Sequence, residues 1–300
     1  LWAIETGGEV MAFNVRFYVN RLEKASSSLT TVGAGGYTDG GGAALNFQEV
    51  DTYSPGSLSA SACSLKIDSD VNASGGTIAV GHTFAAVWIR NYPTGGFGAG
   101  AILTVYSDDN SAFTTPVSRG SQTFAAAGIS ATQHLMLITF TSQTERYWNF
   151  DFTVMGTAPE VSMVMLGKYY DVTSRWDWGA TPGGMDSRHG LRQFNQLSEL
   201  SNGNRLRRSM RTNGAEQILR SWELLDKTNY DMLADIFEAT RGSYLPFVMV
   251  EDDLTAMSAH RLCTFGIDSL AEVTTEPVYQ LYNAALPIIQ MPYTNSGETF

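Results

Sequence analysis

Short apolar runs separated by clusters of turn residues fill the first 172 positions of the chain. Within the runs, apolar and polar residues alternate, which is the pattern of antiparallel strands with one buried face. The Gly, Asn and Asp residues between the runs tolerate the positive φ of tight turns. We therefore predict a β-sandwich over residues 1–172. Its expected strands are 13–19, 82–92, 101–107, 134–140, 147–155 and 161–166, and its expected turns are 33–43, 68–76, 93–100 and 107–113.

The pattern changes after this half. Residues 173–190 contain Gly, Pro and Trp with little periodicity, and we interpret them as a linker or crossover between domains. Residues 191–300 form a second predicted domain, with strands on both sides of one helix. After that helix we expect strands at 244–250, 260–267 and 277–289, with Pro246 and Pro287 at strand starts, edges or bulges.

The helix is predicted over residues 229–241. Thr228 is expected to cap its N-terminus, with Asp231 capping in return, and Gly242 is expected to take the left-handed conformation that ends it. The apolar residues fall on one face, so the helix should lie on a sheet. That face comprises Tyr230, Leu233, Ile236 and Phe237.

Composition supports a β-rich globular chain. Of 300 residues, 43% are hydrophobic and only 16% are charged, and there are 29 glycines. The net charge of −11 argues against generic attraction to nucleic acid or anionic membrane. Cys63 and Cys263 are expected to be small buried residues of separate domains. Residues 1–10 precede Met11, which resembles a natural start, and we assign them no role; we see no signal peptide and no apolar run of spanning length.

Catalytic and metal-binding motifs are weak, so we predict no enzyme, no cofactor and no metal. Adjacent carboxylates such as Asp108 and Asp109, or Glu251 to Asp253, point apart on a strand or turn. The run Asp68, Asp70, Asn72, Ser74 imitates a calcium loop, although Ala73 replaces the required glycine, so a plain polar turn is the main alternative. The histidines lack ligand spacing. These are His82, His134, His189 and His260.

Two groups of residues are candidates for binding. Tyr92, Phe97, Trp176 and Trp178 lie in predicted loops, where aromatic side chains either contact a glycan or fibre or pack against their own domain. The segment 205–211 concentrates arginine in an acidic chain, and it forms either a subunit interface or a solvated strand. Alternation places three of its arginines on one face and the fourth on the other. The first three are Arg205, Arg207 and Arg211, and the fourth is Arg208.

The first half resembles galactose-binding-like (discoidin-type) jelly rolls, in the order of its segments 85–92, 101–113 and 145–154. The second half is similar to the tail-tube-type split β-barrel of bacteriophage distal tail proteins. That similarity rests on the element order over 185–293 and on Gly242, Pro246 and Phe247 after the helix. The resemblance implies a mainly β fold, with a jelly roll followed by a split barrel carrying one flanking helix.

The same resemblance implies a structural virion protein of a siphophage tail tip, assembled in the bacterial cytoplasm. Its expected partners are further copies of itself in a ring, with a hexamer expected, the tail tube protein, hub and tip proteins, the tape measure protein, and fibres or host glycans. Because a basic channel lining would slow DNA through phosphate attraction, we expect the arginine-rich hairpin at subunit contacts. Two alternatives remain. One is a carbohydrate-binding host-recognition module of a tail fibre or spike, and the other is a glycan hydrolase with an appended sandwich.

Overall fold

The computed structural model describes most of both halves of the chain. The described residues are 15–22, 28–33, 63–89, 97, 100–124, 135–153, 155–156, 161–172, 188–192, 195–199, 205–209, 215–251, 260–266, 273–276 and 281–290. In this part of the chain the protein is mainly β with one helix, as predicted. That helix is neither long nor apolar enough to cross a membrane.

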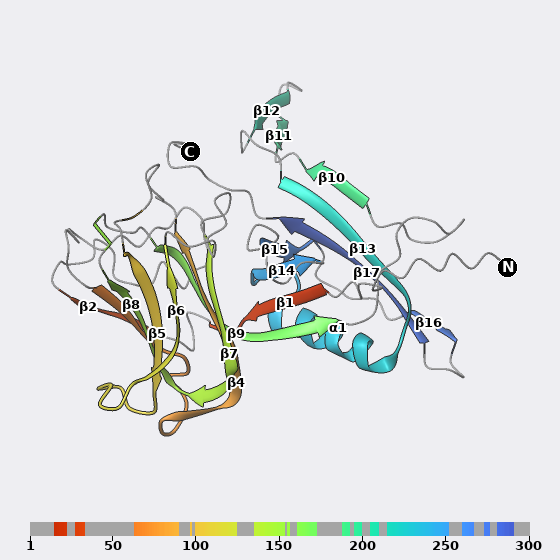
Figure 1. The fold of residues 1–300 in the computed structure, drawn as a ribbon. Coiled ribbons are helices and arrows are strands. Elements are labelled where there is room, and N and C mark those ends of the chain that lie inside the picture. Colours follow the sequence, from red (N-terminus) through yellow and green to blue (C-terminus); the bar gives the residue numbers. More distant parts are fainter. Residues whose placement is uncertain are drawn as a thin grey trace, which may run out of the picture.

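A β-sandwich forms the first lobe, which confirms the predicted architecture (Figure 1). One of its layers is a five-stranded antiparallel sheet in the order β2-β3-β8-β5-β6. Those strands are Ser28–Gly33, Cys63–Asp68, Tyr147–Thr153, Ile102–Asp108 and Val117–Thr123. The facing layer contains β4 (Thr77–Ile89), β7 (Leu135–Glu145) and β9 (Val161–Val172). We call β2 to β9 the sandwich lobe.

Alternating apolar side chains of both layers fill the sandwich. From the five-stranded sheet come residues such as Leu103, Trp148 and Phe150, and from the facing layer come residues such as Val87 and Leu166, all almost fully buried. This alternation is the one that the sequence predicts for segments such as 147–155. Three strands were not predicted, namely β2, β3 and β6. Strands β2 and β6 are rich in Ser, Thr and Gly and lack a clear apolar period, whereas β3 was missed although its apolar residues alternate at Leu65 and Ile67.

The second lobe, which we call the helical lobe, places α1 on one face of a sheet (Figure 1). Its strands are β10 (Arg188–Arg192), β13 (Ala215–Leu225), β14 (Phe247–Glu251), β15 (His260–Phe265), β16 (Val273–Glu276) and β17 (Leu281–Gln290). Leu233 and Ile236 of the helix are fully buried against strand residues such as Phe247 and Phe265. The described strands form no closed barrel, since β10 and β7 are opposite ends of one path of pairing.

Helix α1 spans Lys227–Thr240, and its predicted apolar face is confirmed. The predicted N-cap is wrong: Asp226 caps the helix, because its carboxylate accepts from the backbone N of Asn229 at 2.8 Å. The hydrogen bonds from the backbone and side chain of Asn229 lower the pKa of Asp226. Asp231 pairs instead with Lys227, at 2.6 Å. At the other end Arg241 is the left-handed C-cap, with φ 52°, and Gly242, the predicted cap, follows it in the same conformation with φ 64°.

Pro287 lies inside β17, where its carbonyl accepts from Gly266 N at 2.6 Å. Its missing N–H faces the same side, just beyond the last β15 pairing, Phe265 with Ile288. The missing N–H therefore costs at most the bond at the end of this ladder, which is why a proline is tolerated in the strand. Pro246 directly precedes β14, as expected.

Strand β1 (Val15–Asn20) joins the two lobes in one continuous sheet. It pairs with β9 of the sandwich lobe on one edge and with β14 of the helical lobe on the other, so Phe17 lies opposite both Tyr170 and Met249. The resulting order is β10-β13-β17-β15-β14-β1-β9-β4-β7. The sequence placed this strand with the sandwich, whereas its inward residues Val15, Phe17 and Val19 belong to the core under α1.

Tight packing holds this junction. A Cβ on Gly167 of β9 would come 2.0 Å from the carbonyl O of Val19, so only glycine allows this approach. At the end of β1, the buried Asn20 side chain accepts from Leu166 N at 3.1 Å. Arg16 forms a two-pronged ion pair with Asp171, and its guanidinium carbon lies 4.3 Å from the centroid of the Tyr169 ring.

Candidate functional site

The structure tests few of the predicted contact residues. Phe97 is buried, and its ring packs against Phe124 at a centroid distance of 4.8 Å, which is the packing alternative rather than an exposed contact. Tyr92, Trp176, Trp178 and Arg211 lie outside the described residues.

The predicted arginine-rich hairpin is present in the backbone. Strands β11 (Asn195–Glu199) and β12 (Arg205–Ser209) pair only with each other among the described strands. The register sets Arg207 opposite Leu197, and Arg208 opposite Gln196.

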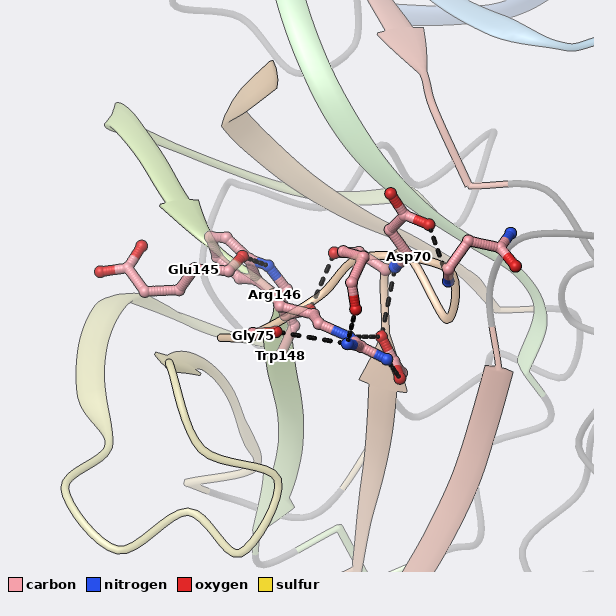
Figure 2. Close-up of polar contacts among 9 residues, drawn as sticks. Asp70, Gly75, Glu145, Arg146 and Trp148 are labelled. Atoms are coloured by element: carbon pink, nitrogen blue, oxygen red, sulfur yellow. Dashed lines mark hydrogen bonds and ion pairs between the residues drawn. The ribbon is translucent and has the colours of Figure 1, made fainter. Parts of the chain in front are cut away.

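The loop that imitates a calcium site is occupied by an arginine (Figure 2). Arg146, from the β7–β8 turn, donates from Nε and Nη2 to the two carboxylate oxygens of Asp68, each at 2.6 Å. Its Nη1 donates to the carbonyl oxygens of Ala73 and Gly75. The guanidinium therefore satisfies the carboxylate and carbonyl oxygens that a calcium ion would bind.

Backbone bonds complete this brace. Ser69 N and Arg146 O are 3.1 Å apart, Arg146 N and Gly76 O are 2.9 Å apart, and the Ser69 hydroxyl also donates to Arg146 O. The bidentate bond to Asp68 raises the pKa of Arg146. The loop 69–76 is thus fixed against the β7–β8 turn, and we interpret its acidic residues as structural. No cluster of potential metal ligands occurs in the described part of the chain.

Asp108, a candidate acid in the enzyme alternative, is also a loop brace. Its side chain is buried, and its two oxygens accept from Asn110 N at 3.0 Å and from Thr115 N at 2.9 Å. Both oxygens are therefore engaged in shaping the β5–β6 loop, which argues against a catalytic role.

A buried histidine lies inside the sandwich next to the junction. The ring of His82 meets Trp148 edge-on at 5.5 Å between centroids, and neither ring nitrogen has a hydrogen-bond partner in the described structure. Burial lowers the pKa of His82 to about 3, with a further contribution from the positive charge of Arg21. His82 is consequently neutral at physiological pH.

The outer face of the five-stranded sheet carries a varied set of polar groups. Two rows cross its three central strands: Lys66, Asn149 and Tyr106 are in register, and so are Ser64, Asp151 and Thr104. We call these six residues the outer polar face. All but Ser64 are partly exposed. The face thus offers an amine, an amide, a carboxylate and hydroxyl groups side by side.

Two groups on this face are poorly satisfied. Asn149 Oδ1 is buried and has no hydrogen-bond partner in the described structure. Burial raises the pKa of Asp151. Period-two alternation in the segment YWNFDFT predicts that Asn149 and Asp151 face outward, but only the strand register shows which residues lie beside them.

Comparison with known proteins identifies no family. No protein-family model matches the chain, and no curated protein matches its sequence. Solved structures share a distant likeness over about half of it. A chitosan-binding module of a chitosanase/glucanase from Paenibacillus sp. IK-5 is 13% identical over 50% of this chain and 98% of that chain, with a TM-score of 0.37.

Two further structures are similarly distant. The module CBM32-3 of a family 31 glycoside hydrolase from Clostridium perfringens is 12% identical over 49% of this chain and 94% of that chain, with a TM-score of 0.34. A GH29 fucosidase from Ruminococcus gnavus is 11% identical over 50% and 27% of the two chains, with a TM-score of 0.36. At TM-scores below 0.5, the function must be argued from the residues of this chain.

Proposed function

We propose that this protein is a non-enzymatic structural subunit of a bacteriophage tail tip, of the distal tail or baseplate type, that connects the tail tube to the tip and its fibres. The supporting observation is β1, which is hydrogen-bonded to β9 of one lobe and β14 of the other. A connector must keep the two proteins that it joins in a fixed relative orientation. A sheet that runs without a break through both lobes suits that role better than two domains on a flexible linker.

The hairpin of β11 and β12 is the proposed contact with neighbouring subunits. It pairs with no other described strand (Figure 1), and its strand edges suit strand addition or packing against an adjacent copy. Arg205, Arg207 and Arg208 would meet carboxylates of the neighbour, since the chain carries a net charge of −11. Repetition of one such contact around an axis closes a ring.

The test is the mass of the full-length protein by light scattering, with negative-stain imaging of the same peak. We expect a ring with a central hole, and we expect antibodies against the protein to label phage tail tips. Replacing Arg205, Arg207 and Arg208 together by Gln should weaken the ring, whereas the control Lys227→Gln on the exposed side of α1 should not. A monomer at every concentration, together with unlabelled tails, would overturn the proposal.

A second candidate function is glycan binding by the sandwich lobe, in a host-recognition role on a fibre or spike. The outer polar face favours it, because partly exposed carboxylate, amide, amine and hydroxyl groups next to aromatic rings are the groups that bind sugars. A printed array of bacterial and mammalian glycans tests it directly. Saturable binding to one glycan class supports this function, and failure of the intact protein to bind any glycan rules it out.

A further inference from the structure

The outer polar face contains a buried hydrogen-bond acceptor that has no partner in the described structure. Buried polar atoms are normally paired, because an unpaired one pays the cost of desolvation without a compensating hydrogen bond. Asn149 Oδ1 is nevertheless buried without a partner, and on the neighbouring row Asp151 is partly desolvated without a neutralising cation in the described structure. The amide oxygen of Asn149 and the carboxylate of Asp151 are hydrogen-bond acceptors, so a ligand for this face should carry hydrogen-bond donors.

We infer that the outer polar face is a saccharide-binding site, in which Asn149 and Asp151 accept hydrogen bonds from sugar hydroxyls and Phe113 covers one side of the ring. The inference rests on the second candidate function and assigns it to the sheet rather than to the loop residues Tyr92 and Phe97 that the sequence suggested.

The spacing of the face fits one or two sugar rings. Neighbouring strands lie about 4.8 Å apart, and residues two apart along a strand are separated by roughly 6.8 Å. Three in-register residues in each of two rows therefore present their groups over about 10 by 7 Å. Lys66 and Thr104 lie at diagonal corners and can donate, whereas Asn149 and Asp151 occupy the central strand between them.

Phe113 supplies the apolar side of the proposed site. The Nζ of Lys66 lies 4.5 Å from the centroid of the Phe113 ring, which places this ring beside the first row. Phe113 has φ 52°, a left-handed conformation that is costly for a residue other than glycine. Such strain persists where the surrounding structure fixes it, and an aromatic ring held over polar groups is a common way to stack on a sugar.

The loop that carries Phe113 is fixed without a ligand. Asp108 accepts from Asn110 N and Thr115 N, Asn110 accepts from Ala112 N at 2.9 Å, and Phe113 N donates to Asn110 O at 3.0 Å. A site whose loop is already ordered loses little conformational entropy on binding. Asp108, which sequence analysis considered as a catalytic acid, thus has a positioning role in this site.

The chemistry favours a neutral saccharide over other ligands. A carboxylate at the centre repels anions such as phosphate, and two acceptors with one ammonium group nearby do not form a cation cage. Hydroxyl groups donate to the carboxylate and the amide oxygen, and they accept from Lys66. One face of a sugar ring is made of C–H groups and can pack on the Phe113 ring.

The experiment applies the fluorescently labelled full-length protein to a printed array of neutral and charged mono- and oligosaccharides, with the polyamine spermidine as a soluble competitor. We expect binding to neutral saccharides that spermidine does not displace. Asp151→Asn and Asn149→Ala should each weaken it at least tenfold. Asp235→Asn makes the same chemical change on an exposed position of α1 and should bind like the wild type. Phe113→Ala should weaken binding, and Phe113→Tyr should restore it.

The outcomes separate the site from the function. Saccharide binding that survives in Asp151→Asn and Asn149→Ala places the glycan elsewhere and overturns this inference, while the second candidate function stands. No binding by the wild type to any saccharide overturns both. Binding that spermidine displaces shows a site for cationic amines and overturns the saccharide assignment. Circular dichroism of each variant verifies that lost binding is not lost folding.

Discussion

Different kinds of interaction stabilise the sandwich lobe and the helical lobe. At one end of the sandwich lobe, arginine side chains tie neighbouring segments together: Arg146 binds Asp68 beside the loop 69–76, and Arg119 of β6 binds Glu145 at the end of β7, in pairs that are largely shielded from solvent. In the described helical lobe the stability comes from apolar packing of α1 on the sheet, and the pair Lys227–Asp231 is exposed. Ion pairs thus stabilise the end of the sandwich lobe, where the segments have little apolar surface to bury. Apolar burial stabilises the sheet that α1 covers.

The largest effects should show whether the lobes unfold together. Phe150→Ala in the sandwich core and Phe247→Ala in the core under α1 each remove a fully buried ring, at a cost of about 3 to 5 kcal/mol. Because β1 links both cores, we expect each variant to lower the midpoint of one shared transition in calorimetry. Two separate transitions, of which each variant moves only its own, would contradict the coupling of the lobes through β1.

Gly167→Ala tests the junction itself. The added Cβ would lie 2.0 Å from Val19 O, so β1 must move away from β9, and we expect a loss of about 2 to 3 kcal/mol in urea unfolding. The control is Gly266→Ala in the helical lobe, where the nearest atoms lie at 3.3 Å and the loss should be smaller. Equal losses in the two variants would show that the approach of β1 to β9 is not tightly constrained.

Arg146→Ala tests the loop brace of the sandwich lobe. Removing the guanidinium leaves Asp68 and the carbonyls of Ala73 and Gly75 without their donor, and we expect a loss of about 1 to 3 kcal/mol. Lys227→Ala removes an exposed helix pair and should cost at most about 0.5 kcal/mol. If added Ca²⁺ raised the melting temperature of the wild type, the arginine would not be the cation of this loop.

His82 should make stability depend on pH in a defined direction. Its pKa falls from 6.5 to about 3 on folding, so the unfolded chain binds more protons between these values. The folded chain keeps this ring neutral while the unfolded chain takes up a proton, so stability that is present above pH 6.5 is lost as the pH falls from there toward 3, by up to about 1.4 kcal/mol per pH unit. Urea unfolding of His82→Phe between pH 6.5 and 5 should show a shallower decline than the wild type. Identical slopes would disprove this role.

Sequence patterns predicted which segments form strands and helix better than they predicted which segments pair with each other. The alternation in residues 147–155 correctly buries Trp148 and Phe150, and the spacing of Tyr230, Leu233 and Ile236 correctly gives the helix face. Strand β1 was also predicted, but its position between β9 and β14 was not, because pairing between distant segments leaves no local pattern. Arg146 was missed for the same reason, since its partners Asp68 and Ala73 are remote in sequence.

The placement of β1 also has a consequence for the order in which the chain folds during synthesis. This strand leaves the ribosome before both of its partners, so Phe17 must wait for Tyr170 and then for Met249 before both of its edges are paired. The sandwich can form while β14 is still being translated, which leaves one edge of β1 open to other chains. Slow translation after residue 172 would therefore prolong the exposure of that edge and favour aggregation. A chaperone bound to the edge would protect the nascent protein from it.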